Sequence, residues 1–206
     1  MLFITGTDTG VGKTFFSVSL IRALRDLGIE AVGFKPVETG CQPYCRDVRL
    51  LSEASGIYLE PVYSFKTPVA PSVAADIEGV KVSAEQIKER ISELSELYPF
   101  LVIEGAGGIM VPITWSYLYL DLVRELSLPV IVVALNKLGV INHTLLTVKA
   151  CKSEGVNVRG VVLNSFKEED ESFKSNYDSL KKLLDVPVYP FSQPQDARTV
   201  ALSLIS

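Results

Sequence analysis

Thr5-Gly6-Thr7-Asp8-Thr9-Gly10-Val11-Gly12-Lys13-Thr14 is the most informative segment of the 206-residue chain. It follows a short apolar run over residues 2–4 and opens a helical pattern over residues 12–27. Glycines between a strand and a helix let successive backbone N–H groups face an anion, and the helix N-terminus adds positive potential. Lys13 can then reach the β- and γ-phosphates, and the Thr14 hydroxyl can bind Mg²⁺. The segment predicts a phosphate-binding loop for a nucleoside triphosphate.

Two positions in this loop depart from the usual pattern. Thr7 stands where a glycine normally precedes the Gly-Lys pair by five residues, and Gly6 lies one position earlier. Loops that act on a dimer partner's nucleotide carry a lysine at position 7, and this loop does not. A glycine-rich turn with an exposed lysine is the alternative. It is disfavoured because Gly-Lys-Thr follows an N-terminal strand, where a phosphate loop needs it.

Apolar runs and helical patterns alternate along the rest of the chain. This alternation predicts parallel strands joined by right-handed crossovers. We expect an α/β fold, a three-layer parallel sheet flanked by helices like that of P-loop NTPases, in a single domain over residues 1–206. Residues 56–79, rich in proline, serine and alanine, are expected to form a long connection. The expected strands are 2–4, 30–34, 100–103, 129–135, 158–163 and 186–189, and the expected helices are 12–27, 47–54, 83–97, 119–127, 142–153, 170–184 and 196–205.

The charge balance argues against a nucleic-acid partner. The chain has 20 basic and 24 acidic residues, which gives a formal net charge of −4. No segment has the length and apolarity of a membrane span, and Met1 leads into the first strand without a leader pattern. We expect a cytoplasmic protein that has no membrane partner.

The three cysteines, Cys41, Cys45 and Cys151, are an odd number, which argues against a disulfide framework. Cys41 and Cys45 could form half of a metal site, but the only histidine is His143 and there is no second cysteine pair. Free thiols in a reducing compartment are the expectation.

Several polar residues stand where predicted strands end, which is where ligands bind in open parallel sheets. Glu104 follows an apolar strand, as the Mg²⁺-binding carboxylate does in phosphate-loop enzymes, although it could also cap the glycine turn expected at residues 105–108. Lys35 ends the second strand and could hold an anionic substrate group against the γ-phosphate. Asp47 begins a helix, so it is either an N-cap or a second metal ligand.

Asn136-Lys137-Leu138-Gly139 is similar to the guanine-reading motif Asn-Lys-x-Asp. Gly139 replaces the aspartate that would bind guanine, so GTP specificity is rejected. Asn164 could read an adenine edge through its amide, or it could be an ordinary turn residue. His143 has no partner histidine and is expected to be structural or interfacial.

Several blocks together resemble the dethiobiotin synthetase family. They occur in the family's order and span most of the chain. The blocks are residues 5–14, Phe34-Lys35-Pro36-Val37-Glu38-Thr39-Gly40, Pro68-Val69-Ala70-Pro71, Glu104-Gly105-Ala106-Gly107-Gly108 and Lys137-Leu138-Gly139-Val140-Ile141-Asn142-His143.

The resemblance implies a reaction that the residues alone do not. The family closes a ureido ring on 7,8-diaminononanoate with CO₂, ATP and Mg²⁺. One amine forms a carbamate, whose oxygen attacks the γ-phosphate to give a carbamic-phosphoric anhydride, and the second amine then displaces phosphate. Such chemistry needs positioning and charge neutralisation.

The resemblance also implies roles for individual residues. Lys13 would stabilise the transferring phosphoryl group and Lys35 the carbamate. The enzyme would be a homodimer in which the substrate tail reaches the neighbouring subunit. The Mg²⁺ ligands would be Thr14, Asp47 and Glu104. The substrate-binding residues would be Thr9, Lys35, Thr39, Gly139, Val140, Asn142 and Tyr177. The nucleotide-binding residues would be Gly10, Val11, Gly12, Lys13, Thr14, Phe15, Asp47, Glu104, Gly105, Ala106, Gly107, Asn164, Ser165, Pro190, Phe191, Ser192 and Gln195.

Two further functions predict sequence features that this chain lacks. A ParA/MinD-type regulatory ATPase switch should carry a lysine at position 7 and a basic or amphipathic surface element, and neither pattern is present. An amide-forming enzyme of the cobyrinate type would normally carry an attached glutaminase domain, for which 206 residues are too few.

Overall fold

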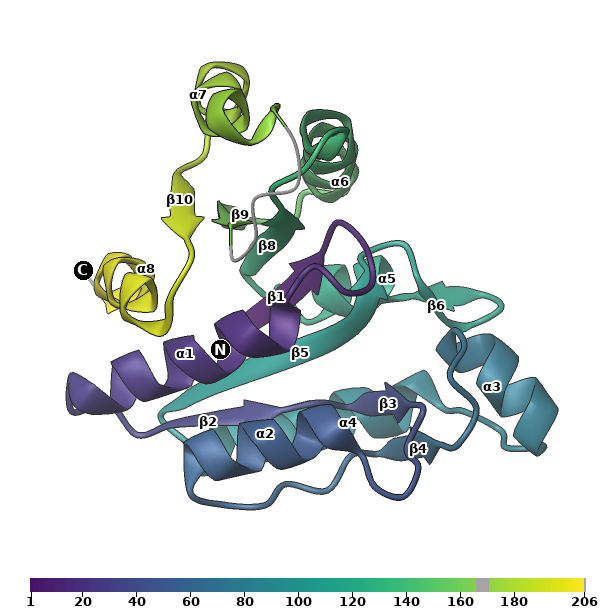
Figure 1. The fold of residues 1–206 in the computed structure, drawn as a ribbon. Coiled ribbons are helices and arrows are strands. Elements are labelled where there is room, and N and C mark those ends of the chain that lie inside the picture. Colours follow the sequence, from purple (N-terminus) through teal and green to yellow (C-terminus); the bar gives the residue numbers. More distant parts are fainter. Residues whose placement is uncertain (166–170, 206) are drawn as a thin grey trace.

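The computed structural model describes residues 1–165 and 171–205. Its main sheet has six parallel strands in the order β10-β9-β8-β1-β5-β2, which confirms the predicted fold class (Figure 1). Strand β1, which leads into the phosphate loop, lies between β8 and β5. The strands are β1 (Leu2–Gly6), β2 (Ala31–Phe34), β5 (Phe100–Gly108), β8 (Val130–Leu135), β9 (Val158–Asn164) and β10 (Val188–Phe191).

Helices cover both faces of this sheet. Alternate residues of a strand point to opposite faces, so Leu2 and Ile4 pack with α1, α2 and α8, while Phe3 packs on the opposite side with α4, α5, α6 and α7. In Figure 1, α1 crosses in front of the sheet and α4 and α5 lie behind it. The helices are α1 (Lys13–Asp26), α2 (Arg46–Ser55), α3 (Pro71–Glu78), α4 (Ala84–Leu97), α5 (Tyr119–Glu125), α6 (Val140–Ser153), α7 (Phe173–Leu183) and α8 (Ala197–Ile205), with a short 3₁₀ turn η1 (Pro194–Asp196).

The prediction of a glycine turn at residues 105–108 was wrong, because these residues continue β5 to Gly108. Gly108 pairs with Gly6 across the sheet. A Cβ at Gly105 would lie 2.8 Å from the ring of Phe3. The glycines therefore allow close packing at the end of a strand.

The prediction that residues 56–79 form one long connection was also wrong. This segment contains α3 and the short strand β4 (Tyr63–Phe65), which pairs with β3 (Val37–Thr39) in a separate two-stranded sheet. A small hairpin of β6 (Pro112–Thr114) and β7 (Tyr117–Leu118) lies beside α3. Strands of two or three residues carry too little alternation to be recognised in a sequence.

Helix boundaries agree with the prediction more closely. Ser83 caps α4 as expected, because its Oγ accepts a hydrogen bond from the Gln86 backbone N–H. Cys45 holds the N-cap position of α2, so Asp47 lies inside the first turn and is not the N-cap. The predicted start of α7 at residue 170 lies outside the described residues, and β10 runs over Val188–Phe191 instead of residues 186–189.

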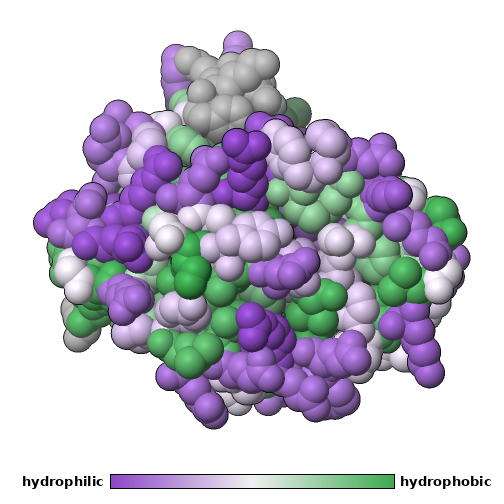
Figure 2. All heavy atoms as spheres, turned by 90° about the horizontal axis from the view of Figure 1, so that it is seen from below, coloured by the Kyte–Doolittle hydropathy of each residue, from purple (hydrophilic) through white to green (hydrophobic). Residues whose placement is uncertain are grey.

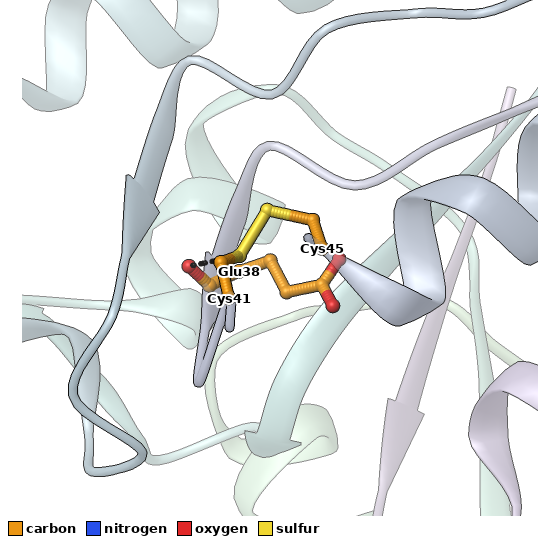
Figure 3. Close-up of side chains that lie close together, drawn as sticks. All are labelled: Glu38, Cys41 and Cys45. Atoms are coloured by element: carbon orange, nitrogen blue, oxygen red, sulfur yellow. Dashed lines mark hydrogen bonds between the residues drawn. A yellow bond between two sulfur atoms is a disulfide. The ribbon is translucent and has the colours of Figure 1, made fainter. Parts of the chain in front are cut away.

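The expectation of free thiols is contradicted at two cysteines. Cys41 and Cys45 form a disulfide that closes the loop before α2, and Cys151 is a buried free thiol (Figure 3). The odd count was misleading because one buried cysteine can stay unpaired while the other two bond. The sulfur atoms lie close to the Glu38 carboxylate, but as a disulfide they are not thiolate ligands for a metal.

Among the described residues, no helix is both long and apolar enough to cross a membrane. Seen from below relative to Figure 1, the surface is mainly hydrophilic, with hydrophobic side chains in small separate groups (Figure 2).

Candidate active site

A cavity of about 600 Å³ lies beside the phosphate loop, where β1, β2 and β5 end. The structure brings together there most of the residues predicted for the phosphate and three of the seven predicted for the substrate. The predicted residues that line it are Thr9, Gly10, Gly12, Lys13, Thr14, Phe15, Lys35, Thr39, Asp47, Ala106 and Gly107. The segment Pro68–Pro71 lines it too, as do Glu38, Arg46 and Val111, which sequence reasoning missed.

The phosphate loop has the backbone that its glycines predict. Gly10 and Gly12 have φ angles of 76° and 90°, and Gly12 is the N-cap of α1. A Cβ at Gly6 would lie 2.7 Å from the carbonyl oxygen of Asp8. The displaced glycine is therefore required by the way the chain turns back on itself.

Lys13 lies largely buried at the start of α1, and its Nζ donates a hydrogen bond to the Asp8 carbonyl oxygen at 3.1 Å. Burial lowers the pKa of Lys13 to about 8, and the positive charge of Lys35 acts in the same direction. A phosphate bound against Lys13 would favour the charged ammonium and raise this pKa.

Lys35 is buried between two carboxylates. Its Nζ lies 2.7 Å from Glu104 Oε1 and 3.0 Å from Asp47 Oδ2. Burial alone would lower the pKa of Lys35, but the two carboxylates outweigh burial and raise it. Burial would likewise raise the pKa of Asp47, yet Lys35 holds it below its usual value. The contact between Lys35 and Asp47 therefore favours the charged form of both groups.

The oxygen atoms beside this triad fit a hard divalent cation. Thr14 Oγ1 donates to Glu104 Oε1 at 2.8 Å, and Asp47 lines the same cavity as Thr14. Glu104 is fully buried, and its Oε2 has no hydrogen-bond partner among the described residues. A buried carboxylate oxygen without a donor is costly, and Mg²⁺ prefers carboxylate and hydroxyl oxygens. Thr14, Asp47 and Glu104 would hold such an ion.

The predicted adenine-side residues gather around the ends of β9 and β10. Asn164 is buried and donates to the Val11 carbonyl oxygen at 2.9 Å, while its Oδ1 has no partner among the described residues. The Ser165 backbone N–H donates to the Phe191 carbonyl oxygen. The rings of Phe15 and Phe191 lie 5.1 Å apart.

The loop after β10 is held by a residue that sequence reasoning missed. Asp196 accepts hydrogen bonds from the backbone N–H groups of Ser192 and Gln193. Gln195, the residue that was predicted, is exposed, and Pro190 pairs with Leu163 within the sheet. An acidic residue at the end of a Ser-x-x-x-Asp stretch was the available signal.

Residues predicted for the substrate tail lie elsewhere. Gly139 is the N-cap of α6 with a φ of 90°, Val140 is buried and Asn142 is exposed. Tyr177 lies half-buried on α7, with the Lys181 ammonium 5.2 Å from its ring centre. Of the described residues that line the 600 Å³ cavity, none belongs to this group.

Asn136, part of the segment similar to a guanine-reading motif, has a structural role. Its Oδ1 accepts from Asn176 Nδ2 at 2.8 Å, and its Nδ2 donates to Ser165 Oγ and the Phe173 carbonyl oxygen. This buried amide pair ties the end of β8 to α7. Asn176 was missed because nothing in the sequence marks its partner 40 positions away.

Comparison with known proteins identifies the family. A family model described as "AAA domain" matches residues 1–190. The curated "ATP-dependent dethiobiotin synthetase BioD" of Methanocaldococcus jannaschii is 38% identical, with 91% of each chain covered. The protein of the same name from Aquifex aeolicus is 40% identical over 95% of this chain and 90% of its own, and that from an Anaeromyxobacter species is 46% identical over 82% and 78%.

Solved structures at low identity support the fold alone. Cobyrinic acid a,c-diamide synthase from Mycobacterium smegmatis, solved with an ATP analogue and magnesium, has a TM-score of 0.61 at 14% identity and covers 99% of this chain and 93% of its own. A ParA family ATPase from Chlorobium tepidum has a TM-score of 0.57 at 14% identity, covering 98% and 87%. With an ATP-binding loop and relatives at 38–46% identity, this chain belongs to the dethiobiotin synthetase family of ATP-dependent ligases in biotin biosynthesis.

Proposed function

We propose that this chain closes the ureido ring of dethiobiotin from 7,8-diaminononanoate, CO₂ and ATP. The observation that carries the proposal is the buried Lys35, held by Asp47 and Glu104 beside Lys13 at one cavity. Two cations next to a phosphate loop suit an anionic nucleophile that attacks a triphosphate.

The reaction would proceed in three steps. One amine adds to CO₂ and loses a proton, which gives a carbamate. The carbamate oxygen attacks the γ-phosphorus, so a carbamic-phosphoric anhydride forms and ADP leaves. The second amine then attacks the carbonyl carbon, and phosphate departs as the ring closes.

Each lysine would have one task in this sequence. Lys13, at the N-terminus of α1, would neutralise charge on the transferring phosphoryl group. Lys35 would hold the carbamate oxygen in line with the γ-phosphorus, since its position between two carboxylates fixes the ammonium in place. Thr9 and Thr39 line the same cavity and would contact the diamine or the carbamate.

A magnesium ion held by Thr14, Asp47 and Glu104 would neutralise charge on the triphosphate. The adenine would lie toward β9 and β10. There Asn164 presents an unpaired Oδ1, an acceptor suited to the adenine amino group, with Ser165 and the loop over residues 190–195 nearby.

The substrate tail would be bound by a second copy of the chain. Gly139, Val140 and Asn142 form the N-terminus of α6, which suits a carboxylate, and Tyr177 lies on the adjoining α7. Leu138 and Leu146 are 75% and 61% exposed in the same region. We propose that they are covered in a homodimer with two shared sites.

The direct test is a phosphate-release assay. Purified protein with Mg²⁺ and ATP should release phosphate in proportion to the diaminononanoate and bicarbonate supplied, and dethiobiotin should appear in equal amount. ATP hydrolysis that proceeds equally without the diamine would refute the synthetase proposal and favour a switch-type ATPase. Sedimentation at the assay concentration gives the oligomeric state. Full activity in a protein that is monomeric under those conditions would contradict the shared site.

A further inference from the structure

Glu38 is a buried carboxylate that the proposed chemistry does not use. It lies on β3, 5% exposed, and its two oxygens accept hydrogen bonds from the first turn of α2. Oε1 accepts from the Asp47 N–H at 2.9 Å and Oε2 from the Val48 N–H at 2.8 Å. The first N–H groups of a helix have no partner within the helix, and a carboxylate there is favourable. Glu38 therefore caps α2 from a separate strand.

The N-cap residue itself does not perform this task. Cys45 occupies the N-cap position, its side chain makes no capping hydrogen bond, and its sulfur is bonded to Cys41. Figure 3 shows the Glu38 carboxylate directed toward the start of α2, beside the disulfide-closed loop. Of the described residues that contact this turn, Glu38 is the one whose side chain receives its backbone N–H groups.

The capped turn carries Asp47, whose side chain contacts Lys35. Its Oδ2 lies 3.0 Å from Lys35 Nζ, while its backbone N–H is bonded to Glu38. Lys35 and Glu38 are three residues apart on the same segment. The segment over residues 35–38 thus contacts Asp47 at both its backbone N–H and its carboxylate.

We propose that Glu38 is a positioning residue that fixes the first turn of α2 and thereby sets the Asp47 carboxylate for Lys35 and the metal ion. The inference rests on the proposed function, because Asp47 matters only if this cavity binds a metal–nucleotide complex. Outer partners that orient a metal ligand typically change metal affinity about 10–100-fold when removed.

The experiment compares Glu38→Ala, Glu38→Gln and a matched control. Glu38→Ala removes both acceptors, whereas Glu38→Gln keeps one acceptor oxygen. Ser83→Ala removes a helix cap from α4, which lies behind the sheet and does not line the cavity. Mn²⁺ binding to the protein with ADP is measured by electron paramagnetic resonance, and exchange of the Asp47 and Val48 amide protons by NMR.

We expect the Mn²⁺ dissociation constant to rise about tenfold or more in Glu38→Ala and by a smaller factor in Glu38→Gln. The amide protons of Asp47 and Val48 should exchange faster than in the unmodified protein, with the larger increase in Glu38→Ala and the smaller one in Glu38→Gln. Ser83→Ala should leave the Mn²⁺ constant and both amides unchanged. Because these readouts need no turnover, they remain informative even if diamine-dependent activity is absent.

Two results would overturn the proposal. One is Mn²⁺ affinity and amide exchange in Glu38→Ala that match the unmodified protein. The other is a rise in the KM for diaminononanoate alone, which would mean that Glu38 touches the substrate directly. If Glu38→Ala does not fold, Glu38→Gln is judged by the same two criteria.

Discussion

The two ends of the proposed nucleotide site are built from different interactions. At the phosphate end, Lys13, Lys35, Asp47 and Glu104 are buried or half-buried charges that lie against one another. At the base end, Asn164 and its neighbours are amides, hydroxyls and backbone groups. Charges fixed in a dry site act strongly on charge that develops in a reaction, whereas neutral hydrogen bonds mainly hold a shape. Substitutions at the phosphate end should therefore change rate, and those at the base end should change affinity.

The largest effect is expected from Lys35→Ala. Removing this cation leaves the carbamate oxygen without its partner, so kcat should fall about 10²–10³-fold while the dissociation constant for ATP changes little. Steady-state kinetics and equilibrium ATP titration measure the two quantities. Lys182→Ala, at an exposed lysine on α7, is the control and should keep full activity. Loss of ATP binding alone in Lys35→Ala would show that its role is nucleotide binding.

Asn164→Ala should have the opposite effect to Lys35→Ala, because it should weaken ATP binding and largely keep kcat. It leaves the Val11 carbonyl oxygen of the phosphate loop unpaired and buried, at a cost of about 1–3 kcal/mol in the free energy of unfolding. The dissociation constant for ATP should rise about tenfold, an equivalent cost of about 1.4 kcal/mol, with kcat at saturating ATP largely kept. A fall in kcat as large as that of Lys35→Ala would remove the distinction between the two ends.

The pH dependence of ATP binding should report the phosphate end. Burial and the charge of Lys35 lower the pKa of Lys13 to about 8 in the free protein. Bound phosphates favour the ammonium and raise that pKa, so below pH 8 binding needs no proton. Above pH 8 binding takes up one proton, and affinity should fall by up to about tenfold per pH unit. Calorimetry in buffers of different ionisation enthalpy detects this uptake, and Lys13→Arg should abolish it.

The smallest effect on catalysis is expected from the disulfide. Cys41→Ser with Cys45→Ser frees a short loop, which should lower the free energy of unfolding by about 2 kcal/mol on the chain-entropy relation. Activity should hardly change, because Glu38 still caps α2. Denaturant unfolding and the phosphate-release assay measure the two effects. A large loss of activity would show that the loop itself positions Asp47. Cys151→Ser is the control for loss of a buried thiol.

Much of the phosphate end could be predicted from the sequence. Strand-helix alternation predicts parallel strands, and the ends of such strands meet at one edge, which brings the phosphate loop, Lys35 and Glu104 together. Asp47 was harder to place, because the residue type suits both a helix cap and a metal ligand. The structure excludes the first role, because Cys45 holds the N-cap position.

The base end was less predictable because its residues act through distant partners. Asn164 bonds to a carbonyl 153 positions away, and Asn136 and Asn176 form a pair across 40 positions. Asparagine is also common in turns, so residue type alone carries little information there. The pairing of Cys41 with Cys45 does not follow from local pattern either.

The sequence by itself determined the order of the six main strands and of the helices other than α3, the phosphate loop and the placing of charged residues at strand ends. These features depend on local periodicity and on the backbone freedom of glycine, which are properties of short segments. Only the tertiary structure decided that Glu38 caps α2, that Asp47 turns toward Lys35 and that β5 continues through its glycines. Those outcomes depend on which distant groups meet in a space too small and too dry to leave a charge or an N–H unpaired.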